Sequence, residues 1–231
     1  MKWFLNLKIR YKLVLAFSIV VISTLFVGYK ATQGMVTTMD ALDELNATRL
    51  PLIENFGVIE ASLNKIMVGE RGLLIPEITG DKRTAQYEYI TKAIEKADEA
   101  FSKLSKLELD EKDTEIMNNL KDKWSSWMSI HSSLISLNKE MDNSVEQEGI
   151  RNSIVDKSLI SREAALSIMP IISEGITYNN QLAHDEHVVA DEEYATAYSL
   201  SIIATIFSAI AAIGLGFLIS FSTGTPLNTL A

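Results

Sequence analysis

Few side chains in this sequence have the types and spacing that a chemical site requires. His184, His187 and Asp191 follow one another at intervals of three and four residues, so all three can lie on one face of a helix. Two imidazoles and a carboxylate at this spacing can coordinate a divalent metal ion. The alternative is a generic polar helix face on which His187 contributes to helix packing.

Three arginines, Arg71, Arg151 and Arg162, are candidate groups for binding an anionic ligand. A guanidinium group donates two parallel hydrogen bonds to a carboxylate, which suits it to this class of ligand. The alternative is that each arginine forms a surface ion pair with one of the many neighbouring Asp and Glu side chains.

An aromatic stripe is formed by Trp124, Trp127 and His131, which recur at intervals of three and four residues on one predicted helix face. Such a stripe can line a ligand pocket between facing helices of a bundle. It can equally belong to the hydrophobic core, with His131 half-buried beside a hydrogen-bond partner.

Composition argues against several classes of function. The 231 residues include no cysteine, which excludes disulfides, cysteine-ligated zinc and a thiol nucleophile. The sequence has no glycine-rich phosphate loop, nucleophile elbow or HExxH helix, so we expect neither an enzyme nor a cofactor. A net charge of −9 argues against nucleic acid as a partner.

Charge is distributed unevenly along the chain. Residues 1–12 carry four basic side chains and no acidic one, whereas all 30 acidic residues lie between Asp40 and Glu193. The stretches 13–30 and 198–222 are apolar, and a helix needs roughly 20 such residues to cross a bilayer. We therefore predict two transmembrane helices on either side of an acidic segment, residues 31–197.

The first apolar stretch has a second interpretation as a cleaved signal peptide. Its apolar run is longer than that of a usual signal peptide, and no small-x-small cleavage site follows Phe26, which favours a membrane span. The positive cluster in residues 1–12 should stay in the cytoplasm, which places residues 31–197 outside it. We expect a protein of the inner, cytoplasmic membrane.

The second predicted span carries a small residue at every fourth position. Such a ridge lets another helix approach closely, although ordinary Ala and Ser content explains it equally well. The ridge consists of Ala204, Ser208, Ala212, Gly216 and Ser220.

Residues 31–197 show helical periodicity almost throughout. Apolar residues alternate at spacings of three and four, the pattern of helices that cross at about +20°. The fold class is therefore all-α: an up-down-up-down four-helix bundle whose two outer helices continue into the transmembrane helices. The predicted helices are 31–75, 82–107, 112–142 and 150–197.

Both outer helices contain a proline, Pro51 and Pro170, at comparable predicted heights above the membrane. A proline inside a helix removes one backbone hydrogen bond and kinks the helix. Paired kinks would open a cavity or form a hinge. The alternative for Pro51 is that it restarts a helix broken after Arg49.

The two ends of the chain add a resemblance to a known family. The opening WFLNLKIRYKLVLAF resembles the start of many methyl-accepting chemotaxis proteins, and the order of span, four-helix bundle and span is similar to their ligand-binding module. The closing TGTPLNTLA, which contains Pro226 and Leu227, resembles the entry of the HAMP linker, here residues 223–231. Sensor histidine kinases and membrane-bound cyclases share the same input half.

The resemblance implies a chemoreceptor input module that senses an amino acid, an organic acid or a periplasmic protein. It also implies a homodimer, and a signal passed by helix displacement to Pro226 and Leu227. Amino-acid sensors of this family use arginines on their first and fourth helices, which points to Arg71, Arg151 and Arg162. The alternatives are the input half of a histidine kinase or cyclase, and a stand-alone membrane-anchored interaction protein. Because the family's signalling parts are absent, we expect a fragment of a longer protein.

Overall fold

The computed structural model describes residues 7–144 and 148–228, which are helical apart from short connections and contain no β-strand. The chain divides into two compact units, residues 43–185 and the paired segments 1–42 and 186–231, and each is described by itself. The elements are α2 Ile9–Glu44, the π-helical turn η1 Leu45–Arg49, α3 Leu50–Leu73, α4 Gly80–Leu104, α5 Glu111–Asn143, α6 Glu148–Leu166 and α7 Met169–Asn228.

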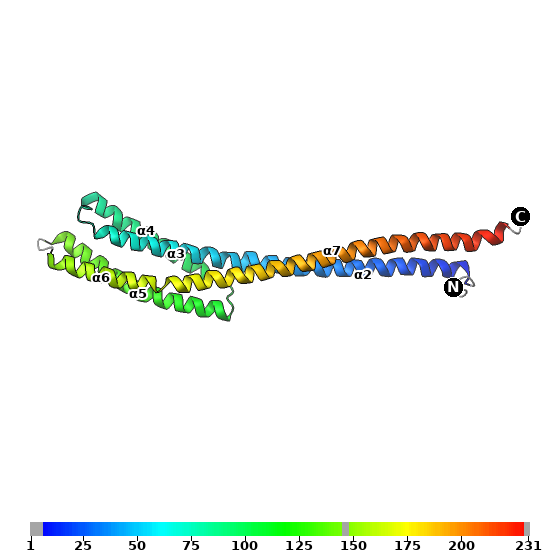
Figure 1. The fold of residues 1–231 in the computed structure, drawn as a ribbon, viewed down its shortest axis with the longest axis horizontal. Helices are drawn as coiled ribbons and strands as arrows, with labels where there is room; N and C mark the ends of the chain where they lie inside the picture. Colours follow the sequence, from blue (N-terminus) through cyan, green and yellow to red (C-terminus); the bar gives the residue numbers. More distant parts are fainter. Residues whose placement is uncertain (1–6, 145–147, 229–231) are drawn as a thin grey trace. The chain divides into compact units, whose positions relative to one another are not determined.

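The unit of residues 43–185 is a four-helix bundle, so the predicted fold class is confirmed. Figure 1 shows α3 beside α4 and α5 beside α6 in this unit. The first turns of α7 continue the course of α6. The predicted helices 82–107 and 112–142 match α4 and α5 to within three residues at each end. Asp110 caps α5 by accepting a hydrogen bond from the backbone N–H of Asp113, which explains where this helix begins.

The core of the bundle follows the predicted apolar seams. Its buried side chains come from α3, α4 and α5, joined by Ala165 of α6, by Ile168 of the turn that follows it, and by Ile171 and Ile172 at the start of α7. Burial of this apolar surface is the main stabilising contribution to the fold. The largest of these side chains are Trp127, Phe56, Leu52, Ile59, Leu63, Leu104 and Leu120.

The helical backbone is irregular just before each of the two prolines, Pro51 and Pro170. Before Pro51 the chain makes the π-helical turn η1, in which the backbone N–H of Leu50 bonds to the carbonyl of Leu45. Before Pro170 the helix is interrupted at Ser167 and Ile168, because proline has no N–H and its ring clashes with the carbonyl four residues earlier. The predicted irregularities at Pro51 and Pro170 are therefore confirmed, and a π-helical turn rather than a break precedes Pro51.

A buried ionic contact ties η1 to α5 and α7. Arg49 Nη1 lies 2.8 Å from Asp113 Oδ2 and 3.1 Å from Asn179 Oδ1, and Asn179 Nδ2 donates to Asp113 Oδ1 at 2.8 Å. Asp113 and Asn179 are fully buried. Arg49 Nη1 and both polar atoms of the Asn179 amide are hydrogen-bonded in this contact, which fixes the start of α5 and one turn of α7 against η1.

Further carboxylates surround Arg49. Glu44 Oε1 lies 2.8 Å from Arg49 Nη2, and Asp110 Oδ2 lies 3.4 Å from Nη1 and accepts a hydrogen bond from the Tyr178 hydroxyl at 3.0 Å. Burial raises the pKa of Asp113 above its usual range. Burial acts on Asp110 in the same direction, but hydrogen bonds from the Asp113 backbone and from Tyr178, with the charge of Arg49, lower its pKa overall.

The unit formed by the segments 1–42 and 186–231 is a pair of helices from α2 and α7. Gly34 is buried, and a Cβ built on it would lie 2.7 Å from Ala197 Cβ, so the two backbones approach closely there. Outward-facing apolar side chains such as Phe17 and Ile210 are 67 % and 65 % exposed. Both helices are long and apolar enough to cross a membrane.

Only part of the predicted small-residue ridge lies in the contact between these helices. Ala204 and Ser208 are half-buried, whereas Ala212 and Gly216 are exposed and a Cβ on Gly216 would meet no neighbour within 4 Å. Ser220 is also exposed. A spacing of four residues drifts around a helix of 3.6 residues per turn, so the half-buried positions continue instead through Ala211 and Leu215.

Replacing glycine by alanine should have opposite effects on stability at two helical positions of the bundle. A Cβ on Gly57 would meet no atom within 4 Å, so Gly57→Ala should stabilise the bundle by about 0.5–1 kcal/mol through helix propensity. A Cβ on Gly175 would lie 2.8 Å from the buried Phe56 ring, so Gly175→Ala should destabilise it by about 1–2 kcal/mol. Thermal unfolding of the two variants checks this, and an equal stabilisation of both would contradict the packing of α7 on α3.

Removal of the Arg49 charge should make stability depend on pH. In Arg49→Met the buried Asp113 carboxylate has no cation, so we expect a loss of about 3–5 kcal/mol at neutral pH. Its raised pKa would rise further, and a raised carboxyl pKa gives stability that is present at low pH and lost as pH increases through that pKa. Unfolding measured from pH 4 to pH 8 should show stability falling toward neutral pH.

The control for this experiment is the double variant Arg49→Met with Asp113→Asn. It removes the buried charge together with its partner, so most of the added pH dependence should disappear. Equal pH profiles of the single and double variants would contradict the role assigned to Asp113.

Candidate functional site

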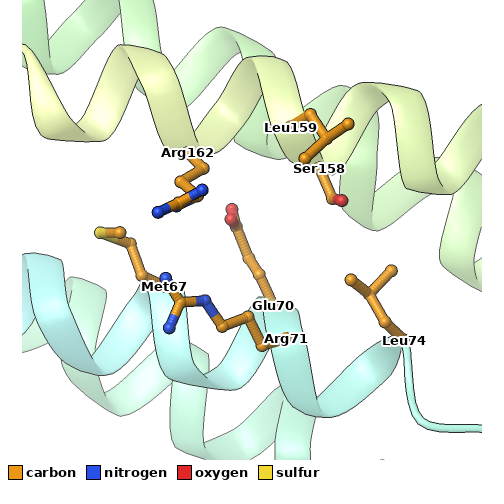
Figure 2. A pocket seen from close by; sticks show the side chains of 7 residues that line it. All are labelled: Met67, Glu70, Arg71, Leu74, Ser158, Leu159 and Arg162. Carbon is orange, nitrogen blue, oxygen red and sulfur yellow. The ribbon is translucent and has the colours of Figure 1, made fainter.

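A pocket of about 370 Å³ lies between α3 and α6 in the bundle. Its α3 wall repeats at spacings of three and four residues, so successive turns present the same face of the helix. Figure 2 shows the side chains of both helices around this space. The lining residues are Met67, Glu70, Arg71 and Leu74 from α3 and Ser158, Leu159 and Arg162 from α6.

The two arginines of the pocket are the main candidates for binding. Figure 2 shows Arg71 extending along α3 and Arg162 reaching from α6, with both guanidinium groups near Met67. Both side chains are exposed, and within residues 7–144 and 148–228 neither makes an ion pair. The alternative interpretation, surface pairing with Asp or Glu, therefore does not describe these two residues.

Glu70 contributes a buried carboxylate to the same pocket. It is 4 % exposed, and its Oε1 lies 2.6 Å from His131 Nδ1. The Ser161 hydroxyl lies 3.0 Å from each carboxylate oxygen and in turn accepts a hydrogen bond from Trp127 Nε1 at 3.0 Å. This chain of buried hydrogen bonds joins α3, α5 and α6 directly behind the pocket.

The geometry determines what the pocket can do chemically. Arg71 and Arg162 offer unpaired donors to an anion, while Glu70 is already hydrogen-bonded to His131 and Ser161. Two guanidinium groups that face one space suit a carboxylate, because each can donate two parallel hydrogen bonds. The arrangement fits binding of a small anion better than catalysis, since the pocket contains no group positioned as a nucleophile beside a base.

The structure brings together some of the predicted ligand-binding residues and separates others. Arg71 and Arg162 line the same pocket, but Arg151 is exposed near the start of α6 and does not line it. Trp127 is fully buried and Trp124 is 7 % exposed, and their rings meet edge to face at 5.1 Å between centroids. Both tryptophans therefore occupy the core, where Trp127 also anchors Ser161.

His131 is more buried than the sequence suggests. The sequence predicts a half-buried seam residue with a hydrogen-bond partner, and the structure gives 3 % exposure and Glu70 as that partner. Its role in ligand binding stays a prediction.

The predicted metal ligands lie along α7. His187 Nε2 is 3.6 Å from Asp191 Oδ2, and both side chains are about two thirds exposed. The predicted place of His187 on the packing seam is wrong, because the seam passes through Ala183, Glu186 and Ala190 instead. In the part of the chain that the structure describes, no three His, Asp or Glu side chains are placed to hold a metal ion. Metal binding by His184, His187 and Asp191 stays a prediction.

Sequence reasoning missed Glu70 and Ser161. A usable signal was present for Glu70, which interrupts the apolar seam of α3 between Ile66 and Leu73. A charged residue on a buried face requires a partner from another helix. No sequence feature identifies Ser161 as that partner, because serine is common on both buried and exposed helix faces.

Comparison with known proteins agrees with this architecture. Residues 6–194 match the family described as the four helix bundle sensory module for signal transduction. The match covers most of the chain, so the chain belongs to this family. No curated protein and no solved structure matches the chain. The predicted resemblance to the sensor module of chemotaxis proteins is confirmed at the level of the family.

Proposed function

We propose that this chain is the input module of a transmembrane chemoreceptor and that its α3–α6 pocket binds a small carboxylate, an amino acid or an organic acid. The observation that carries the proposal is the pair of unpaired guanidinium groups, Arg71 and Arg162, in a pocket of about 370 Å³. Membership of the sensory family supports signal transduction as the purpose of binding.

The ligand would contact α3 and α6, the two helices whose chain continues into the apolar segments. Arg71 lies near the end of α3, which follows α2 through η1, and Arg162 lies near the end of α6, just before the interruption at Ser167 and Ile168. A carboxylate held by both side chains favours one spacing of α3 and α6. Binding shifts the population of a two-state helix packing when the ligand has different affinities for the two states.

The helix α7 provides a continuous path for the signal. It runs from Met169 to Asn228, so its backbone remains helical through Pro226 and Leu227, the predicted entry to the linker. Small displacements of a helix are transmitted along it because its backbone hydrogen bonds keep it rigid. We assign these last residues the role of output connection.

A second copy of the chain is part of this proposal. Exposed apolar side chains of α6, among them Val155, Leu159 and Leu166, lie on either side of Arg162. Their spacing of four and seven residues, about one and two turns, places them on one face of the helix. A homodimer that covers this face would exclude water from the edge of the α3–α6 pocket.

Ligand binding should depend on Arg71 and Arg162. Thermal unfolding of the full chain in detergent, against a panel of amino acids and organic acids, should reveal a ligand that stabilises the protein by about 2.7 kcal/mol at 100 times its Kd. Arg71→Gln and Arg162→Gln should each weaken binding of that ligand by about 10–100-fold, because each removes a charged hydrogen-bond donor.

Arg151→Gln is the matched control, since it removes an equal charge from α6 outside the pocket. It should leave the Kd within about twofold of the original, as expected for an exposed distant charge. Equal effects of all three substitutions would show a nonspecific charge effect and would contradict the site.

The membrane orientation is tested by single-cysteine labelling, because the natural sequence contains no cysteine. In intact cells, a membrane-impermeant maleimide should label Lys96→Cys, an exposed position of α4, and should not label Lys8→Cys until the membrane is permeabilised. Labelling of Lys8→Cys alone in intact cells would place the N-terminus outside the cytoplasm and overturn the proposed orientation.

A further inference from the structure

A second cavity, of about 280 Å³, lies between α4 and α5. Its lining is divided between apolar and polar side chains, and the apolar ones are Ile90 and Ile94 from α4 and Met128 and Ile135 from α5. Polar groups occur at separate places, with His131 among the lining residues and Lys139 two turns further along α5. Apolar side chains beside polar groups that can orient a ligand are found in small-molecule sites.

His131 presents a free edge to this cavity. Its Nδ1 is occupied by Glu70 at 2.6 Å, and because a carboxylate accepts hydrogen bonds, Nδ1 carries the proton. Nε2 is the second ring nitrogen and can hydrogen-bond to a ligand group. Within the described residues it has no hydrogen-bond partner, although the residue as a whole is only 3 % exposed.

Lys139 supplies a cation at one end of the cavity. Its Nζ lies 5.8 Å from the centre of the Tyr87 ring, and no carboxylate pairs with it in the ranges 7–144 and 148–228. The nearby Asp142 is already bonded to Arg83 and to the Tyr87 hydroxyl.

We propose that the α4–α5 cavity is a second binding site, which takes a small hydroxylated carboxylate with an apolar body. The carboxylate pairs with Lys139, the body packs on Ile90 and Ile135, and the hydroxyl hydrogen-bonds with His131 Nε2. The site lies across the imidazole ring from Glu70 and does not depend on the ligand proposed for the α3–α6 pocket.

The simplest probe of this chemistry is 4-hydroxybenzoate, whose charged and donor groups stand at opposite ends of one ring. For about ten non-hydrogen atoms, a Kd of about 0.1–1 mM is within the range of good small ligands. Benzoate is the matched ligand without the hydroxyl group. One hydrogen bond to Nε2 should make 4-hydroxybenzoate bind about 3–10-fold more tightly than benzoate.

The experiment is a titration of the full chain in detergent, followed by NMR of the histidine ring protons. The His131 signals are separated from the other two by the substitutions His184→Asn and His187→Asn. We expect 4-hydroxybenzoate to shift the His131 signals in a saturable manner. Lys139→Gln should weaken binding about 3–10-fold, because it removes the only cation among the residues that line this cavity.

A blocking variant tests the location without touching the core. Ser132 lines the cavity and is exposed, so Ser132→Phe should fill the opening and abolish the shift while the thermal unfolding temperature stays near the original. Arg71→Gln should leave the titration unchanged. The proposal is overturned if neither probe shifts His131 below about 10 mM, if Ser132→Phe binds as before, or if Arg71→Gln removes binding.

Discussion

A carboxylate buried inside a helical bundle needs hydrogen-bond donors from other helices, and Glu70 imposes this constraint on the sensor. Its donors are His131 from α5 and Ser161 from α6, so satisfying one charge fixes three helices relative to each other. Leaving such a group unsatisfied costs several kcal/mol. The position of α6 on α3, and with it the position of Arg162 beside Arg71, follows from this contact.

The same contact explains why the two arginines are left free. Glu70 is the acidic side chain that lines the α3–α6 pocket, and its hydrogen bonds to His131 and Ser161 hold it at the buried side. Arg71 and Arg162 extend over the more exposed part of the pocket, where an anion from solution can reach them. The bundle thus separates a structural charge from two charges that are available to a ligand.

A second polar contact constrains the helix that we assign to signal output. Arg49, placed by the π-helical turn before Pro51, holds Asn179 of α7 together with Asp113 of α5. A π-helical turn adds one residue to a helix.

The sequence predicts the helices well and the site only in part. Apolar spacings of three and four residues depend on local geometry alone, so α4 and α5 could be placed within three residues, and both prolines marked irregular turns. Arg71 and Arg162 could be chosen by residue type and position. That Arg151 lies outside the pocket could not be predicted, because this depends on which turns of α3 and α6 face each other across Glu70 and Ser161. The sequence placed His187 on the packing seam, whereas the structure places the neighbouring Glu186 there. A difference of one residue is too small for helical periodicity to resolve.

The central claim, that the α3–α6 pocket binds the carboxylate ligand, is tested most directly by hydrogen–deuterium exchange of the full chain with and without the stabilising ligand. Backbone amides report local opening and need no substitution that perturbs the fold. The account predicts that protection increases most in peptides covering residues 67–74 of α3 and 158–162 of α6. Protection confined to other helices, with these two segments unchanged, would contradict it.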